Sequence, residues 1–544
     1  MYKLVSKRNI ILILVILLAA FLRFFKLSEI PITLNHDEIS QLYDAASIVQ
    51  TKKDIYGNFL PLVFPSTGDF KIGYYTYLST ISYLLFGGKE VAIRIPVAFF
   101  GTLSVLGVFL FIKALTKNWT IAILSAFLVV LTPSEIFYSR KSFESIMGVC
   151  FVFFGFYFLL KNLEAGQRKL WGFIAVLFFV LAMYIYTSYA LVIPILLSIF
   201  FLFFKNRVIE QKRNLTILFV TLAISLVPLF YINLTNPNVR FRGVSVFIGQ
   251  DPNLGRLISL TGNSAKSYFD FIFIKYLNQL DPTYLFINGL DLTNQGLYDL
   301  GPLLFWQLPI FLLGIIFIIK DKSYTNQGKF LLAAVLAAMI PSAITFEDYS
   351  PHRAILAFAI MSIISGFGLY WLINIISFYI KNSRIKIIVL IILFASLIVN
   401  FIYAARIYIV SYPFEKSEKM QYPFKQVILY AWSQINSFDA IVFDPQFGEI
   451  NPIIGVGVPY YIGYYGNIPA GEFQKKYKLG IKPREVLFDK FSIRQVIWGE
   501  DHDLKNTLLV ASPWSIPLDQ IKPDMILKRF NFYNGSPAFY AIKL

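Results

Sequence analysis

Residues 387–409, IIVLIILFASLIVNFIYAARIYI, decide the fold class of this protein. Apart from Arg406 the run carries no charged side chain, and its length is that of a helix crossing the hydrocarbon core of a bilayer. Further runs of this kind predict a polytopic α-helical membrane protein with about 11 transmembrane helices. The predicted spans are 9–26, 91–112, 119–137, 143–160, 170–186, 189–204, 214–232, 303–319, 330–346, 353–379 and 387–409. The first is interpreted as an anchor, because it contains no small-residue cleavage site typical of a signal peptide.

The composition agrees with a membrane protein. Hydrophobic residues make up 57% of the 544 residues and charged residues only 15%, which excludes a soluble globular domain and a disordered chain. Cys150 is the single cysteine, so neither an intrachain disulfide nor a cysteine-based zinc site can form.

The net charge is +17, and the basic residues are divided unequally between the loops on the two sides of the membrane. With the N-terminus placed in the cytoplasm, the inside segments carry 18 Lys and Arg residues and the short outside loops carry three, namely Arg140, Lys141 and Arg353. The basic excess is therefore a topology signal, and a nucleic-acid partner is not expected. The sequence predicts a multi-pass protein of the cell membrane, with a transmembrane module over 1–410. Its exterior loops are 27–90 and 233–302, and a small exterior α/β domain follows over 411–544.

The first exterior loop holds two adjacent carboxylates, Asp37 and Glu38. Neighbouring residues on a helix point about 100° apart, so one can face a site while the other orients it. Capping and solvation of a helix N-terminus is the alternative interpretation. Lys71 precedes an aromatic stretch, Tyr74–Phe86, which is short for a span and predicts an interfacial helix. The lysine could meet a lipid phosphate there, or only extend its ammonium group to the membrane surface.

These features resemble the GT-C superfamily of glycosyltransferases that use polyprenyl-phosphate sugars, in the branch of protein O-mannosyltransferases and lipid A aminoarabinose transferases. The similarity depends on the order and exterior location of several short motifs. They are Asp37-Glu38, Lys71-Ile-Gly-Tyr-Tyr, Arg94-Ile95-Pro96, Ser139–Glu144, Arg240–Phe247, Asp281–Phe286 with Gly289, and His352-Arg353.

Three departures limit what the resemblance carries over. Phe70 stands where the family often has an acidic residue before the lysine, with Asp69 one position further back, and Glu144 stands where Asp is common. The His-x-His motif of some mannosyltransferases is absent. The resemblance therefore implies a reaction class and no particular sugar.

The resemblance implies transfer of a sugar from a polyprenyl-phosphate donor to an acceptor on the exterior face of the membrane, by inverting displacement. Asp37 would be the general base, Glu38 would orient the chain or the acceptor, and Glu144 would contact acceptor or metal. The cations expected at the donor phosphate are Lys71, Arg94, Arg242 and Arg353. Further candidates are His36, His352, Asp69 and Tyr74.

Several alternatives stay open from the sequence. The three histidines, His36, His352 and His502, show no metal-ligand spacing, and the sequence identifies no certain cofactor. A divalent cation between Asp37 and the lipid phosphate is one alternative, so the displacement is either metal-assisted or metal-free. The acceptor is a protein, a lipid or a glycan, and membrane lipids surround the spans. A lipid-linked glycan flippase or transporter, and a polysaccharide polymerase or ligase with a diphosphate-linked donor, are the competing functions.

Overall fold

The computed structural model describes residues 7–65, 70–164, 170–210, 212–237, 239, 243–244, 246–290, 297, 299–446, 457–479 and 485–544. The chain forms two compact units. One consists of Met1–Phe25 and Val97–Tyr408, and the other of Lys26–Pro96 and Ile409–Leu544. The first is called the helical unit below, and the second the mixed unit.

The helical unit is a bundle of mostly apolar helices. They are α1 (Lys7–Phe24), α4 (Ile95–Thr116), α5 (Trp119–Leu131), α6 (Pro133–Tyr138), α7 (Ser145–Asn162), α8 (Leu170–Ile185), α9 (Thr187–Phe203), α10 (Lys205–Glu210), α11 (Lys212–Thr235), α15 (Gln307–Lys320), α16 (Thr325–Ala343), α17 (Pro351–Tyr379) and α18 (Ser383–Arg406). Between α11 and α15 lie α13 (Pro252–Thr261) and α14 (Ser264–Asn278).

Every predicted span falls on one or more of these helices. Among the described residues, five helices are long and apolar enough to cross a membrane, in α4, α7, α11, α17 and α18. The count of eleven spans stays a prediction. The predicted span 119–137 is divided, because Pro133 disfavours a helical conformation at Thr132, whose φ of −66° and ψ of 123° are extended.

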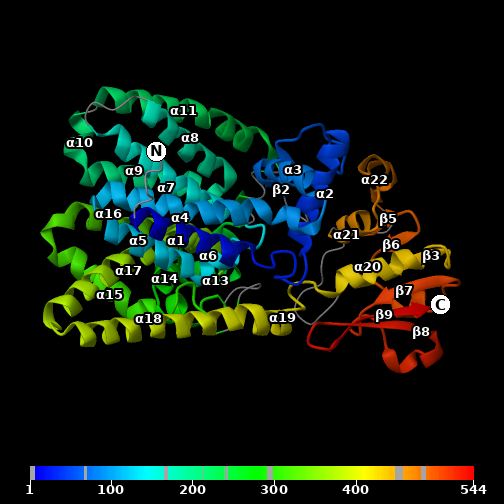
Figure 1. The fold of residues 1–544 in the computed structure, drawn as a ribbon. Helices are drawn as coiled ribbons and strands as arrows, with labels where there is room; N and C mark the ends of the chain where they lie inside the picture. Colours follow the sequence, from blue (N-terminus) through cyan, green and yellow to red (C-terminus); the bar gives the residue numbers. More distant parts are fainter. Residues whose placement is uncertain are drawn as a thin grey trace, which may run out of the picture. The chain divides into compact units, whose positions relative to one another are not determined.

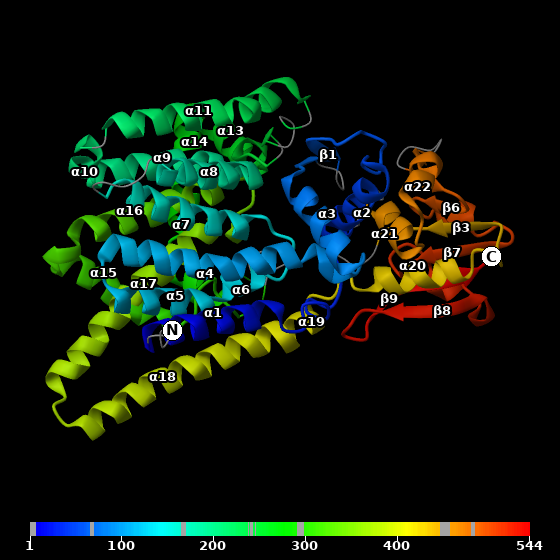
Figure 2. The same ribbon diagram turned by 45° about the horizontal axis from the view of Figure 1, so that its top comes forward.

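Burial separates the inner helices of the bundle from the outer ones. In α17, 83% of the most apolar window is buried, against 6% of the corresponding window in Ser383–Glu415, the span that begins with α18. Glycines bring α17 close to α15: a Cβ on Gly314 would meet the carbonyl oxygen of Ile364, and one on Gly368 would meet that of Ile310. Figure 1 and Figure 2 show α11 and α18 at opposite edges of the bundle. An apolar helix left so bare needs lipid around it, and this chain is a multi-pass membrane protein.

The mixed unit contains a seven-stranded sheet of order β4-β5-β6-β3-β7-β9-β8. The strands are β3 (Ala440–Phe443), β4 (Lys478–Leu479), β5 (Val486–Phe488), β6 (Phe491–Ile493), β7 (Thr507–Ala511), β8 (Ile526–Asn531) and β9 (Pro537–Lys543). Strand β3 pairs in parallel with β6 and β7, and the remaining pairs are antiparallel. The predicted small sheet region near the C-terminus is confirmed.

The same unit contains the first predicted exterior loop. That segment forms α2 (His36–Thr51), the paired strands β1 (Val63–Pro65) and β2 (Phe70–Ile72), and α3 (Tyr74–Phe86). Helix α2 packs against α3 and against α21 (Val458–Tyr465) and α22 (Ala470–Lys476) of the C-terminal region. The Tyr43 hydroxyl on α2 donates to the carbonyl oxygen of Ile468 at 3.0 Å. Segments separated by more than 300 residues therefore share one core.

Candidate functional site

The N-terminal turn of α2 carries the paired carboxylates. Asn35 caps the helix: its side chain accepts from the Glu38 backbone N–H, while the Glu38 carboxylate accepts from the Asn35 backbone N–H. Asp37 takes no part in this cap, and its side chain is 53% exposed, whereas that of Glu38 is 2% exposed. The structure thus separates the pair into one buried and one accessible carboxylate.

Glu38 is fastened by Arg94, which stands directly before α4. Arg94 Nε and Nη2 donate to the two carboxylate oxygens of Glu38 at 2.8 and 3.1 Å. Its remaining N–H groups donate to the carbonyl oxygens of Leu27, Pro31 and Thr33. All five guanidinium donors are therefore used inside the protein. This geometry suits an anchor for the start of α2, and it leaves no N–H of Arg94 for a lipid phosphate.

Lys71 on β2 is also buried and paired. Its ammonium lies 3.3 Å from Asp44 Oδ2 and 3.2 Å from the Ser40 hydroxyl, both on α2. Burial raises the pKa of Asp44 to about 6, and the charge of Lys71 opposes this shift. The contact ties β2 to the second and third turns of α2. The predicted role of Lys71 at a donor phosphate stays a prediction.

His36 is the first residue of α2, and it contacts Gln421 of the C-terminal region. The His36 backbone N–H donates to Gln421 Oε1 at 2.6 Å, and Gln421 Nε2 lies 2.5 Å from His36 Nδ1. The other ring nitrogen, Nε2, lies 3.7 Å from Asp37 Oδ1. The buried hydroxyl of Tyr461 lies 3.1 Å from Gln421 Oε1 and 2.9 Å from the carbonyl oxygen of Leu34. No signal in the sequence pointed to Gln421.

The helical unit brings together two other predicted segments. His352 and Arg353 lie in the first turn of α17, and Glu144 directly precedes α7. The His352 ring lies 5.5 Å from the Phe143 ring, so these two helix starts are neighbours. Arg353 donates to Glu347 at 3.1 Å, and Glu347 also accepts from the Ser350 hydroxyl. Glu347 was not predicted, although the sequence pairs it with Asp348 and places it five residues before His352.

The remaining predicted site residues are Tyr74, Arg242 and Asp69. Tyr74 opens α3 and is half-buried. Arg242 and Asp69 lie outside the described residues. Within the parts of the chain that the structure describes, no group of three or more His, Cys, Asp or Glu side chains is arranged to hold a metal ion. The divalent cation therefore stays an open alternative.

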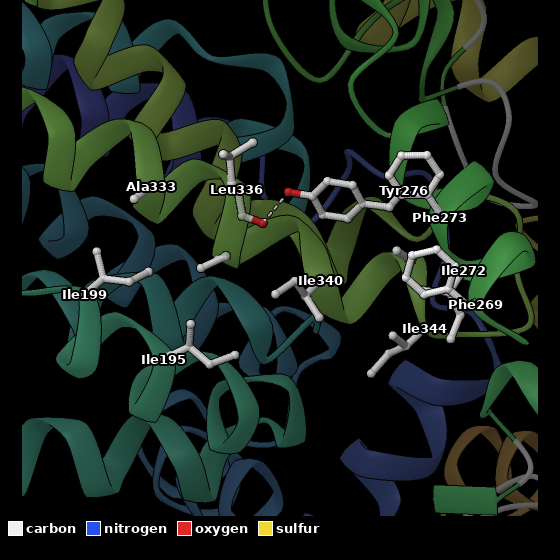
Figure 3. A pocket seen from close by; sticks show the side chains of 12 residues that line it. Ile195, Ile199, Phe269, Ile272, Phe273, Tyr276, Ala333, Leu336, Ile340 and Ile344 are labelled. Carbon is white, nitrogen blue, oxygen red and sulfur yellow. Dashed lines mark hydrogen bonds between the residues drawn. The ribbon is translucent and has the colours of Figure 1, made fainter. Parts of the chain in front are cut away.

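An apolar pocket of about 460 Å³ lies within the helical unit. Its walls come from α9, α14 and α16, as Figure 3 shows, and the Tyr276 hydroxyl donates to the carbonyl oxygen of Leu336 across it at 2.9 Å. Lys275 holds α14 in place: its ammonium donates to the carbonyl oxygens of Thr345 and Phe346 at 2.9 and 3.0 Å. The lining residues are Ile195, Ile199, Phe269, Ile272, Phe273, Tyr276, Ala333, Leu336, Ala337, Ile340, Ala343 and Ile344. Such a surface suits a hydrocarbon chain.

Comparison with solved structures identifies the fold. The structure of ArnT from Cupriavidus metallidurans bound to undecaprenyl phosphate superposes with a TM-score of 0.56 at 12% identity, covering 97% of each chain. This chain has the GT-C fold. The archaeal oligosaccharyltransferase AglB from Archaeoglobus fulgidus, in complex with an inhibitory peptide and a dolichol-phosphate, gives a TM-score of 0.51 at 13% identity. That match covers 85% of this chain and 63% of AglB.

Sequence comparison supports the same assignment. Residues 74–232 match the family described as dolichyl-phosphate-mannose-protein mannosyltransferase. The resemblance to GT-C glycosyltransferases that was predicted from the motifs is confirmed. The matched segment includes Arg94 and Glu144 and begins after Asp37, Glu38 and Lys71, so it does not test those positions. No curated protein matches the sequence.

Proposed function

We propose that this protein transfers a sugar from a polyprenyl-phosphate donor to an acceptor on the exterior face of the cell membrane. The observation that carries the proposal is the accessible carboxylate of Asp37 on a rigidly anchored helix start, in a chain with the GT-C fold. An exposed carboxylate next to a buried ion pair is held in position while it stays open to an acceptor.

Asp37 acts as the general base. It takes the proton of the acceptor hydroxyl as the hydroxyl oxygen attacks the anomeric carbon. The bond from that carbon to the lipid phosphate breaks, and the configuration at the carbon inverts, because no covalent enzyme intermediate forms. The leaving phosphate needs charge stabilisation more than a proton. For it we propose Arg353 and Arg242, and not Arg94, whose donors are all occupied.

The lipid chain of the donor occupies the pocket between α9, α14 and α16. Its lining is almost entirely hydrocarbon, which matches repeating isoprene units and offers nothing to a sugar. Lys275 keeps α14 in place as one wall of this pocket, because its ammonium donates to the carbonyl oxygens of Thr345 and Phe346, just after the C-terminal end of α16. Membrane lipids fill the pocket when no donor is bound.

The test compares Asp37→Asn with the wild type and with Asp503→Asn. Asp503 is an 84% exposed carboxylate in the mixed unit and serves as the matched control. Membranes that contain each variant receive radiolabelled undecaprenyl-phosphate sugars, both hexoses and pentoses, and label transferred to delipidated material and to lipids other than the donor is counted. We expect Asp37→Asn to lower transfer by roughly a hundredfold or more, as for loss of a general base, and the control to leave it unchanged.

Two results would contradict the proposal. Full transfer by Asp37→Asn would remove Asp37 as the base. Transfer that occurs from diphosphate-linked oligosaccharides alone would indicate a polymerase or ligase in place of a monophosphate-dependent transferase.

A further inference from the structure

The contacts of Gln421 determine which nitrogen of His36 carries the ring proton. A backbone N–H can only donate, so the group of Gln421 that lies 2.6 Å from His36 N must be the amide oxygen. The NH₂ group of the same amide then faces His36 Nδ1 at 2.5 Å. Because an amide NH₂ can only donate, Nδ1 must be the acceptor and carries no proton. The proton of the neutral ring therefore resides on Nε2.

The protonated nitrogen is the one beside the proposed base. His36 Nε2 lies 3.7 Å from Asp37 Oδ1. An N–H dipole on that side attracts the carboxylate, whereas the other tautomer would place a lone pair there and repel it. The imidazole thus favours one orientation of Asp37, with Oδ1 toward His36 and Oδ2 toward the acceptor.

The backbone of Gln421 has an unfavourable conformation. Its φ of 62° lies in the left-handed region, which residues other than glycine and asparagine seldom adopt. The Gln421 backbone N–H donates to the carbonyl oxygen of Glu418 at 2.9 Å, which fixes this turn. Burial and nearby carboxylates raise the pKa of Tyr461, so its hydroxyl stays protonated beside Gln421 Oε1. Strained backbone that persists at one point of a loop often serves a site.

We propose that Gln421 is a positioning residue that holds His36 in the Nε2–H tautomer and thereby orients the carboxylate of Asp37 for proton abstraction. The inference rests on the proposed function, since it acts through Asp37. It assigns a task in the transfer reaction to the C-terminal region, which the motifs of the sequence left without one.

The experiment reads the tautomer directly. The chain has three histidines, so ¹⁵N-histidine labelling of the full-length protein in lipid bilayers gives three imidazoles, and His36→Asn identifies the pair of His36. In the wild type at neutral pH we expect Nδ1 to resonate as an unprotonated nitrogen and Nε2 as a protonated one. A protonated Nδ1 in the wild type would overturn the inference.

Two substitutions at position 421 separate the hydrogen bond from the backbone. Gln421→Glu keeps the size and reach but offers only acceptors, so we expect Nδ1 to become protonated. Gln421→Asn suits the left-handed backbone and is one methylene shorter, so we expect the His36 resonances to lose their single tautomer while the unfolding temperature is kept. We expect both variants to lower kcat by roughly tenfold to a hundredfold with little change in KM for the donor, as for a misplaced catalytic group.

The outcomes distinguish this inference from the proposed function. An unchanged tautomer in Gln421→Glu, or unchanged kcat in both variants while Asp37→Asn is inactive, would refute the role of Gln421 alone. If Asp37→Asn retains full transfer, the proposed function fails, and the tautomer of His36 then carries no catalytic meaning even when the resonances are as expected.

Discussion

Replacement of Glu38 by Gln tests whether this carboxylate is structural, in contrast to its neighbour. Glu38 accepts two hydrogen bonds from Arg94 and one from the Asn35 backbone N–H, and both members of the ion pair are 2% exposed. The amide of Gln keeps the shape but presents an NH₂ group to a donor and removes the charge opposite a buried guanidinium. Breaking a buried pair destabilises by about 3–5 kcal/mol. Because the amide retains one acceptor, we expect about 3 kcal/mol.

This loss is large enough to measure by thermal unfolding. At roughly 2–4 °C per kcal/mol for a unit of this size, Glu38→Gln should lower the Tm of the purified protein by about 6–12 °C. The matched control is Asp37→Asn, the same chemical change one residue earlier on an exposed side chain, with an expected effect within about 0.5 kcal/mol. A double-mutant cycle of Glu38→Gln with Arg94→Met isolates the coupling of the pair.

The two neighbouring carboxylates should thus show opposite behaviour. Asp37→Asn should lose transfer and keep stability, and Glu38→Gln should lose stability and keep measurable transfer at low temperature. Equal Tm values for Glu38→Gln and the wild type would refute the assignment of Glu38 as an anchor. Equal destabilisation by both substitutions would refute the separation into one buried and one accessible carboxylate.

Three further predictions follow from the described contacts. Burial raises the pKa of Asp44 from 3.8 to about 6, so the native state binds this proton more tightly than the unfolded state does. The free energy of unfolding should therefore fall as the pH rises from about 4 to about 6. In the double variant Asp44→Asn/Lys71→Met, unfolding measurements should show a smaller dependence of this free energy on pH. Ala337→Phe should fill the apolar pocket and raise KM for a long-chain polyprenyl-phosphate sugar but not for a short-chain analogue, and equal effects on both donors would contradict a lipid chain in the pocket. The side chain at position 502 is 46% exposed, so the variant His502→Cys should react with an impermeant thiol reagent in intact cells. The native Cys150 is buried and should add little background labelling. Labelling only after the membrane is opened would place the C-terminal domain inside.

The predicted spans fall on helices because hydropathy is local, whereas the number of helices that cross the membrane stays a prediction. An apolar run of sufficient length must be helical in lipid, whatever it packs against, so each predicted span falls on a helix. The sequence did not predict the positions of helix breaks, as the division of the span 119–137 at Thr132 shows. The grouping of Lys26–Pro96 with Ile409–Leu544 was not accessible at all, because it depends on contacts such as Tyr43 with Ile468.

The candidate site likewise has features that the sequence predicted and features that only the tertiary structure decided. The sequence by itself determined that this chain is a membrane protein of many helices and that Asp37 and Glu38 stand together near a predicted span end, since composition and motif order are properties of the chain alone. Only the tertiary structure decided that Glu38 is buried against Arg94, that Lys71 pairs with Asp44, and that Gln421 faces His36. The physical reason is that burial and hydrogen bonding depend on which distant segments meet, and no spacing along the chain encodes those partners.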